Sequence, residues 1–275
     1  MVNKVSYYSL DFLSIWFSIF TTEFNRLTTL RKFFASALFR NENPSHAKLL
    51  LAGLLFLILT PIVLWLDSDY FFNRFSFYGR WLANSLTIVY FLWLFVISGT
   101  QLRKLIFTMV IVSYIGELIF CTWLGMYAYR TEHIPLYVPL GHAIVYSSGY
   151  IYAHSQIALQ QKALLNKVFP VLFVLIFLIP VVFLNDMFTL IFSFFFFAVL
   201  KRKRWDNLYY FIALCVIYIE LLGTALHCWK WVPETFGVIP AANPPMGAVF
   251  FYAGGDVIIA KIVSVWGGKK KKKFV

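Results

Sequence analysis

The sequence predicts an all-α integral membrane protein of about eight transmembrane helices, arranged as two tandem four-helix repeats after an N-terminal interfacial amphipathic helix. Three observations lead to this fold class: the apolar composition, the long apolar segments, and the placement of basic residues between them. Of 275 residues, 61% are hydrophobic and 13% are charged, whereas a soluble domain is about one-quarter charged and about half apolar. The composition therefore excludes an ordinary soluble domain.

Eight segments are long and apolar enough to cross the hydrocarbon core of a bilayer, which takes about 20 helical residues. They are 47–66, 82–101, 104–128, 138–158, 168–185, 187–200, 207–230 and 244–266. The fifth and sixth are separated only by Asn185 and Asp186, which predicts a tight hairpin. The alternative is that one of these two segments is re-entrant.

Basic residues distinguish the two sides of the membrane. If the N-terminus is cytoplasmic, the outer loops contain only Arg74, Arg80, Arg130 and Lys230, and nearly all other lysines and arginines are cytoplasmic. Cytoplasmic loops of membrane proteins carry an excess of lysine and arginine. We therefore predict that both termini are cytoplasmic. The expected location is the bacterial inner (plasma) membrane. Because the net charge of +12 comes from short loops, no nucleic-acid partner is expected.

The chain is expected to have four parts: an interfacial segment 1–46, repeats 47–160 and 161–266, and a polybasic tail 267–275. Within the first part, Arg26–Arg40 has leucines and a phenylalanine on one helical face and basic residues on the others. This segment either lies on an anionic membrane surface or packs on the cytoplasmic end of the protein. Lys269–Lys273 in the tail is expected to contact anionic lipids.

The two halves of the chain share residues in the same order, which predicts an internal repeat. The matching elements are Pro61 with Pro180, Asp67 with Asp186, Glu117 with Glu220, Thr122–Tyr129 with Thr224–Trp231, and a Pro-x-Gly-x4-Tyr-x2-Gly pattern at Pro139 with that at Pro245. Around the glutamates, Tyr114-Ile115-Gly116-Glu117 corresponds to Tyr218-Ile219-Glu220 with one residue slipped. Four helices per copy is an even number, so the copies would run the same way through the membrane.

Glu117 and Glu220, both within predicted spans, are the main candidates for catalysis. An ionisable group inside a membrane is costly, so it is expected to face the bundle interior with a partner. Helical spacing places His142, Tyr146 and Tyr150 on one face of the fourth span. The predicted catalytic residues are Glu117, Glu220, His142, His227 and Asp256, and the predicted substrate-binding residues are Tyr146, Tyr150, Tyr252, Trp229, Trp231 and Asn243.

These positions also have structural interpretations. The glutamates and histidines would then hydrogen-bond across helices, and the aromatic residues near the outer ends would form an interfacial belt that includes Tyr127, Tyr129, Trp229 and Trp231.

On the seventh span, one polar–aromatic face is expected to carry Glu220, Thr224, His227 and Trp231.

Loop and glycine positions carry further expectations. We expect Arg130, Glu132 and His133 to be solvated and Asn243 to cap the last span. Close helix packing is expected at Gly141, Gly149, Gly247, Gly254 and Gly255.

No cofactor and no metal are expected. The sequence has no phosphate-binding glycine loop, no Gly-x-Ser-x-Gly and no His-Glu-x-x-His motif. The alternative is a metal held by Glu117, His142, Glu220 and His227, whose side chains would have to converge from three helices. Three cysteines in apolar stretches indicate no disulfide framework.

Glu117 is followed by GMYAYR and IPLYVPLGH, and later in the chain comes WKWVPETFGVIPAANPPMG. These segments resemble carotenoid 1,2-hydratase-type bacterial integral membrane proteins, through a Glu before a Gly-x-Tyr-x-Tyr stretch, a Val-Pro-Leu turn and a Trp-x-Trp pair. Gly125-Met126 stands where the family has a phenylalanine–glycine pair. The resemblance implies protonation of a double bond in a polyisoprenoid and capture of the tertiary cation by water.

Three functions remain open from the sequence. The first is a membrane enzyme, a lyase (hydratase) or isomerase, acting on an apolar lipid or polyisoprenoid substrate. A buried glutamate would supply its neutral acid, aromatic rings would stabilise a cation, and Asp256 or His142 would position water. The second is a proton- or cation-coupled transporter or channel. The third is an accessory subunit of a larger membrane complex or oligomer, which the phenylalanines of Phe194–Phe197 suggest.

Overall fold

The computed structural model describes residues 44–131 and 133–266. The chain divides between Ala47 and Lys48 into two units, and the second of them is the subject here. The expected amphipathic helix around Arg26–Arg40, Glu132 and the polybasic tail 267–275 lie outside the described residues.

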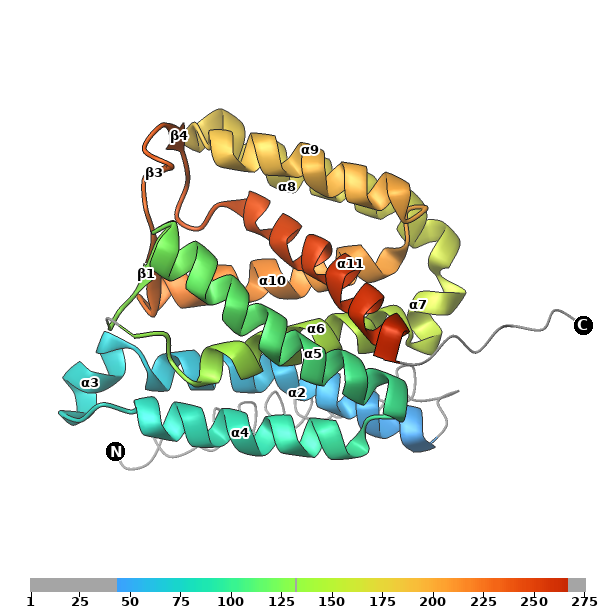
Figure 1. Ribbon diagram of the computed structural model, residues 1–275, viewed down its shortest axis with the longest axis horizontal. Coiled ribbons are helices and arrows are strands. Elements are labelled where there is room, and N and C mark those ends of the chain that lie inside the picture. Colours follow the sequence, from blue (N-terminus) through green and yellow to red (C-terminus); the bar gives the residue numbers. More distant parts are fainter. Residues whose placement is uncertain (1–43, 132, 267–275) are drawn as a thin grey trace, which may run out of the picture. The chain divides into compact units, whose positions relative to one another are not determined.

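Eight long helices make up the described part of the chain (Figure 1). They are α2 (Pro44–Leu66), α4 (Arg80–Ile97), α5 (Thr100–Glu117), α6 (Tyr137–Ala153), α8 (Lys162–Leu184), α9 (Met187–Arg202), α10 (Asn207–Ala225) and α11 (Val249–Trp266). Short helices are α3 (Asp69–Phe75), α7 (Gln156–Gln160), the π-helix η1 (Leu118–Trp123) and the 3-10 helix η2 (Met246–Ala248).

The apolar helices make this chain an all-α integral membrane protein. Six helical segments of the described chain are long and apolar enough to span a membrane: His46–Leu66, Arg80–Ile97, Thr100–Trp123, Lys162–Leu184, Asn207–Ala225 and Met246–Val265. The other two long helices are shorter, with 17 residues in α6 and 16 in α9.

Two of the expected spans end earlier than their apolar composition suggests. The third does not continue as an α-helix to residue 128, because α5 passes into η1 and Gly125 then has a φ of +59°. The seventh ends at Ala225, and His227 has a φ of 57°, a left-handed conformation that stops a helix. The prediction of one helical face from Glu220 to Trp231 is therefore wrong.

Short strands follow these two helices. β1 (Tyr127–Tyr129) pairs antiparallel with β2 (Trp229–Trp231), with Ala128 opposite Lys230. A second hairpin joins β3 (Glu234–Thr235) to β4 (Ile239–Pro240). The end of the bundle that carries these strands, at the left of Figure 1, is called the strand end below.

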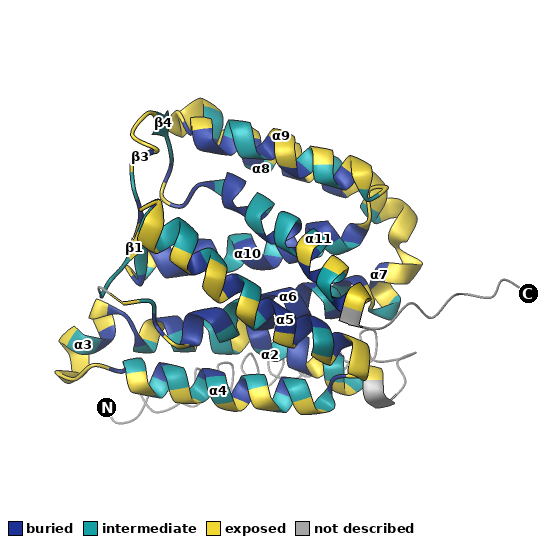
Figure 2. Ribbon diagram, in the orientation of Figure 1, coloured by how far each residue is buried: buried dark blue, intermediate teal, exposed yellow. Residues whose placement is uncertain are grey.

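The centre of the bundle consists of α5, α6, α10 and α11. Helix α6 packs on both α5 and α10, and α11 packs on the same two helices. Figure 2 shows α6 as the most continuously buried helix, whereas α8 and α9 carry many exposed residues. At Gly149 of α6, an added Cβ would lie 2.7 Å from the Cα of Ile212, so glycine permits the close approach of α10.

Candidate functional site

A cavity of about 630 Å³ lies among α2, α4 and the four central helices. Most of its lining is apolar, with side chains such as Phe56, Met109 and Ile262. Its polar lining includes Glu117, His142, Tyr127, Tyr129, Glu220, Trp229, Trp231 and Tyr252. A cavity of this size and composition is typical of a small-molecule site.

Glu117, the last residue of α5, is only 3% exposed and has protein partners on both oxygens. The hydroxyls of Tyr127 and Tyr129 donate to Oε2 at 2.9 and 2.7 Å, and Nε2 of His142 lies 2.8 Å from Oε1. Residues two apart on a strand share a face, so β1 presents both tyrosines to one carboxylate. Burial, and then the charge of Glu117, raise the pKa of Tyr127 and of Tyr129 well above the usual range, which keeps both hydroxyls protonated.

Glu220 on α10 has a matching arrangement with tryptophans. The indole N–H groups of Trp229 and Trp231 donate to its Oε2 at 2.9 and 3.1 Å. The side chain is 9% exposed, and its other oxygen, Oε1, has no hydrogen-bond partner in the described part of the chain. One carboxylate oxygen of Glu220 is thus left for a ligand.

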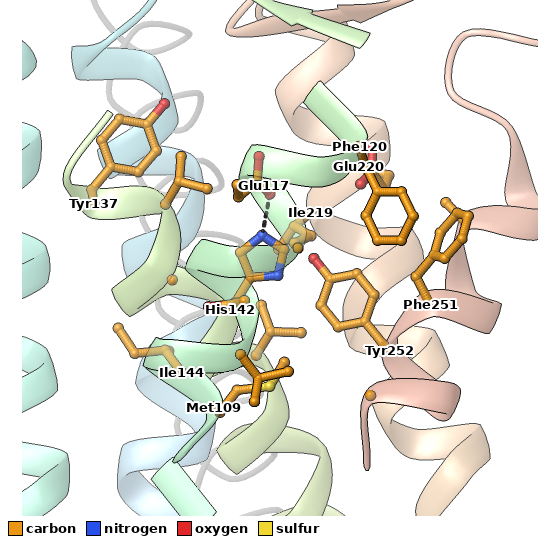
Figure 3. Close-up of a pocket in the computed structure, with 18 of the residues that line it drawn as sticks. Met109, Glu117, Phe120, Tyr137, His142, Ile144, Ile219, Glu220, Phe251 and Tyr252 are labelled. Carbon is orange, nitrogen blue, oxygen red and sulfur yellow. Dashed lines mark hydrogen bonds and ion pairs between the residues drawn. The ribbon is translucent and has the colours of Figure 1, made fainter. Parts of the chain in front are cut away.

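His142 contacts Glu117 on one side and Tyr252 on the other. Its ring is nearly parallel to that of Tyr252 on α11, with centroids 5.0 Å apart. With Nε2 on Glu117, its Nδ1 makes no hydrogen bond to a described residue, and neither does the hydroxyl of Tyr252. Figure 3 shows the His142–Glu117 contact, with Tyr252 beside the histidine ring and Phe251 farther from it.

The predicted residues Asp256 and Tyr146 form a separate polar cluster. Tyr146 and Tyr209 each donate to Asp256 at 2.7 Å, and all three are almost fully buried where α6, α10 and α11 meet. They do not line the cavity. Asp256 lies one helical turn beyond Tyr252, which does line it.

Three other predicted site residues lie outside the cavity lining. The ring of His227 packs near Tyr70, and that of Tyr150 stacks on His154. Asn243 does not cap the last helix as expected, because its Oδ1 accepts a hydrogen bond from the backbone N–H of Trp231 at 3.0 Å. It positions β2 instead.

A buried ion cluster at the strand end was not expected from the sequence. Asp67 is 0% exposed and accepts hydrogen bonds from Arg80, Arg130 and Tyr137. Arg130 also donates to the backbone carbonyl of Asp67 and to the carboxylate of Asp69. The expectation that Arg130 is solvated is therefore wrong. Its partners lie about sixty residues earlier in the chain, a separation that local spacing does not reveal.

The glycines expected to permit close packing fall into two groups. Gly149 and Gly247 do so, with neighbouring backbone 2.7 and 2.8 Å from an added Cβ. At Gly141 and Gly255 an added Cβ would meet nothing within 4 Å, and both residues line the cavity. Close packing is therefore the wrong explanation for those two positions, and for Gly254, whose nearest neighbour is a phenylalanine of its own helix at 3.8 Å.

Within residues 44–131 and 133–266, no three His, Cys, Asp or Glu side chains are arranged to hold a metal ion. Of the four alternative metal ligands, His227 lies away from the cavity. The partners of Glu117 on β1 were the main omission from the predicted site, because the sequence does not indicate that the chain folds back after η1.

No protein-family model, curated protein or solved structure matches this chain. The fold and the cavity define its class: an all-α, multi-pass membrane protein with a buried glutamate–histidine pair in an apolar cavity.

Proposed function

We propose that this protein is a membrane-embedded enzyme, a hydratase or isomerase, that protonates a double bond of an apolar lipid or polyisoprenoid. The observation that supports the proposal is the gathering of Glu117, Glu220 and His142 in one mostly apolar cavity. A neutral apolar substrate suits such a lining, and a positioned acid and base supply the proton transfers.

The hydrogen bonds favour distinct roles for the two glutamates. Both oxygens of Glu117 are occupied by protein donors, so it acts as a positioning residue that orients His142. Glu220 keeps one oxygen without a described partner and is the proton donor. Two carboxyl groups with different surroundings commonly divide acid and base work in this way.

In the hydration reaction, the O–H of Glu220 breaks and its proton forms a C–H bond with one alkene carbon. The π bond supplies the electron pair and leaves a cation at the other carbon. Water attacks that carbon, and its released proton passes to Nδ1 of His142. Return of this proton to Glu220 restores the enzyme, and the net change is the addition of one water molecule. In the isomerase version, His142 removes a proton from a carbon beside the cation.

Aromatic rings beside Glu220 suit the cationic intermediate. Phe120, Phe251, Tyr252 and Trp231 all line the cavity. The face of an aromatic ring attracts a cation within about 6 Å. Asp256, which the sequence suggested for positioning water, lies outside the cavity lining, so His142 takes that role here.

We also propose that all eight long helices cross the membrane, with both termini cytoplasmic in a bacterial inner membrane. Hydrogen bonds at the strand end join the loops that would be external: Arg130 bonds Asp67, β1 pairs with β2, and Thr189 accepts the N–H of Gly247. The basic residues of Lys201–Arg204 lie near the other end, in the last turn of α9 and just after it. This arrangement agrees with the excess of basic residues in cytoplasmic loops.

The test compares Glu220→Gln with the wild type in a host whose apolar lipids are profiled by mass spectrometry. We expect the wild type to produce lipids that are heavier by one water or isomeric with a host lipid, and Glu220→Gln to lose at least about two orders of magnitude of this activity. Glu234→Gln, an exposed residue on β3, is the matched control and should retain activity. Wild-type levels of product from Glu220→Gln would refute the proposed acid.

Proton-coupled transport is the second candidate, and Asp256 is the observation that favours it. With Tyr146 and Tyr209, its carboxylate extends the buried polar groups one helical turn beyond Tyr252. Ionisable groups inside a membrane commonly form proton relays. Proton flux into liposomes that is abolished by Asp256→Asn, with unchanged host lipids, would favour this function over the enzyme.

A further inference from the structure

Four glycines on three helices line the cavity: Gly116 on α5, Gly141 on α6, and Gly254 and Gly255 on α11. The space beside them is not filled by neighbouring helices. An added Cβ at Gly141 or Gly255 would meet nothing within 4 Å. At Gly116 it would meet only Phe120 of η1, and at Gly254 only Phe250 of α11, both at 3.8 Å. Glycine weakens a helix relative to alanine, and helix packing does not explain its presence at these positions.

Corresponding glycines in the two halves of the chain differ in whether a neighbouring helix lies against them. In the shared sequence pattern, Gly141 corresponds to Gly247 and Gly149 corresponds to Gly255. Gly149 and Gly247 are pressed against neighbouring helix backbone, whereas Gly141 and Gly255 border open space in the cavity. Within this pattern, each half of the chain thus has one glycine that permits close helix packing and one that leaves space in the cavity.

A second, independent observation points to a ligand. Oε1 of Glu220 and the hydroxyl of Tyr252 have no hydrogen-bond partner in the described chain, although these residues are only 9% and 7% exposed. Both residues line the cavity, and neither atom is among the fully buried side-chain atoms of the described chain without a partner, which are Asn207 Oδ1 and the Tyr210 hydroxyl, so both atoms keep accessible surface. A ligand with a polar end would supply partners for both.

The charges around that end limit the chemistry of the ligand. Glu117 and Glu220 are both acidic, and His142 is the base beside them. The nearest arginines of the strand end, Arg80 and Arg130, are already paired with Asp67. A phosphate or diphosphate would face like charges without a free cation, so an anionic end is disfavoured.

We propose that the cavity binds a single hydrocarbon chain with a small uncharged polar end, such as an isoprenoid or fatty alcohol. The polar end lies at Glu220 and Tyr252, and the chain lies against the four cavity glycines. Ile115 on α5 and Ile258 on α11 line the cavity and are 51% and 54% exposed, which gives the chain a route from the bilayer. The inference rests on the proposed function, because an alcohol is the product of hydrating an alkene.

The experiment measures binding of tritiated farnesol and tritiated hexadecanol to the purified full chain by scintillation proximity, with farnesyl diphosphate as competitor. Gly255→Leu and Gly141→Leu should weaken binding by about tenfold or more, since leucine takes the space of the chain. Gly99→Leu is the control, because an added Cβ at exposed Gly99 also meets nothing and this residue does not line the cavity. The two alcohols distinguish an isoprenoid chain from a straight one.

The outcomes separate cleanly. Farnesol or hexadecanol binding that survives Gly99→Leu, falls in both leucine variants and resists the diphosphate supports the inference. If a leucine variant does not elute as a single species, Gly255→Ala and Gly141→Ala replace it, and a smaller loss is expected. Unchanged binding in these variants, no binding of either alcohol to the wild type, or equal competition by the diphosphate would overturn it.

One further variant separates this inference from the proposed function. Glu220→Gln keeps a polar group at the same place, so it should bind the alcohol within about threefold of the wild type while its catalytic activity is lost. Alcohol binding together with unchanged lipid products in Glu220→Gln would refute the proposed acid and leave the binding site in place.

Discussion

At the scale of single residues, the fully buried carboxylate of Asp67 depends on its hydrogen-bond partners. Its fully buried carboxylate accepts hydrogen bonds from two guanidinium groups and one phenol, and these groups come from α4, the end of β1 and α6. Removing one partner of a buried ion pair leaves the others without compensation.

Asp67→Asn is expected to lower the free energy of unfolding by about 3–5 kcal/mol, because Arg80 and Arg130 would then share a site with no carboxylate. Thermal unfolding in detergent measures the loss. Asp69→Asn is the matched control, since Asp69 is 53% exposed, contacts the same Arg130 at 3.3 Å and should change stability by less than about 1 kcal/mol. Equal effects of the two substitutions would contradict this account of the cluster.

The sequence predicts some site residues better than others. Glu117, Glu220, His142 and Tyr252 were identifiable because polar groups in apolar helices are costly and few. The tyrosines that bind Glu117 were less evident, since aromatic residues near a membrane surface usually form an interfacial belt. Their role depends on the return of the chain after η1, and no local pattern specifies that return.

At the scale of the elements, substitution by alanine is expected to change stability in opposite directions at two glycines of α6. Gly149→Ala should destabilise the protein by about 1–3 kcal/mol, because its Cβ would lie 2.7 Å from the backbone of Ile212. Gly141→Ala should be neutral or stabilise α6 by up to about 1 kcal/mol, since its Cβ has open space and alanine favours a helix. Unfolding midpoints of the two variants, measured side by side, check the difference, and effects of the same sign would contradict it.

The π-helix η1 lies where the spacing from glutamate to threonine differs between the two halves. Thr122 comes five positions after Glu117, whereas Thr224 comes four positions after Glu220. A π-helical turn holds one residue more than an α-helical turn, and η1 begins immediately after Glu117. The internal repeat remains a prediction, and an inserted residue accommodated in η1 gives this difference in spacing a physical explanation.

Helix positions were largely predictable from apolar segments, whereas helix ends were not. Two long segments were expected to be helical as far as residues 128 and 230. Short aromatic strands stand at these two ends instead of helix. Hydropathy does not separate such strands from helix, because Tyr and Trp are common in both the membrane interface and β-strands. Positive φ at Gly125 and His227 causes the breaks, and only the glycine is a usual signal for one.

At the scale of the whole chain, the number of crossings decides where each loop lies. Helices of 17 and 16 residues are about 25 Å long, slightly shorter than the hydrocarbon core of about 30 Å. We expect both to cross, since α6 lies at the centre of the bundle and basic residues follow α9.

Reporter fusions measure this directly. Alkaline phosphatase fused after Gln160 should be inactive and green fluorescent protein there should be fluorescent, because this loop is expected to be cytoplasmic. Fusions after Asn185 should give the reverse. Phosphatase activity after Gln160 would mean that α6 does not cross the membrane, and the predicted sides of the later loops would then have to be revised.

The pairing of β1 with β2 has a mechanical consequence. β1 supplies the hydroxyls that hold Glu117, and β2 supplies the indoles that hold Glu220. The ladder between them matches Tyr127 with Trp231 and Tyr129 with Trp229. Any movement that parts the halves of the chain at this end must either break the ladder or pull donors from both carboxylates together. A displacement of either strand that keeps this ladder intact therefore moves the hydrogen-bond donors of both carboxylates.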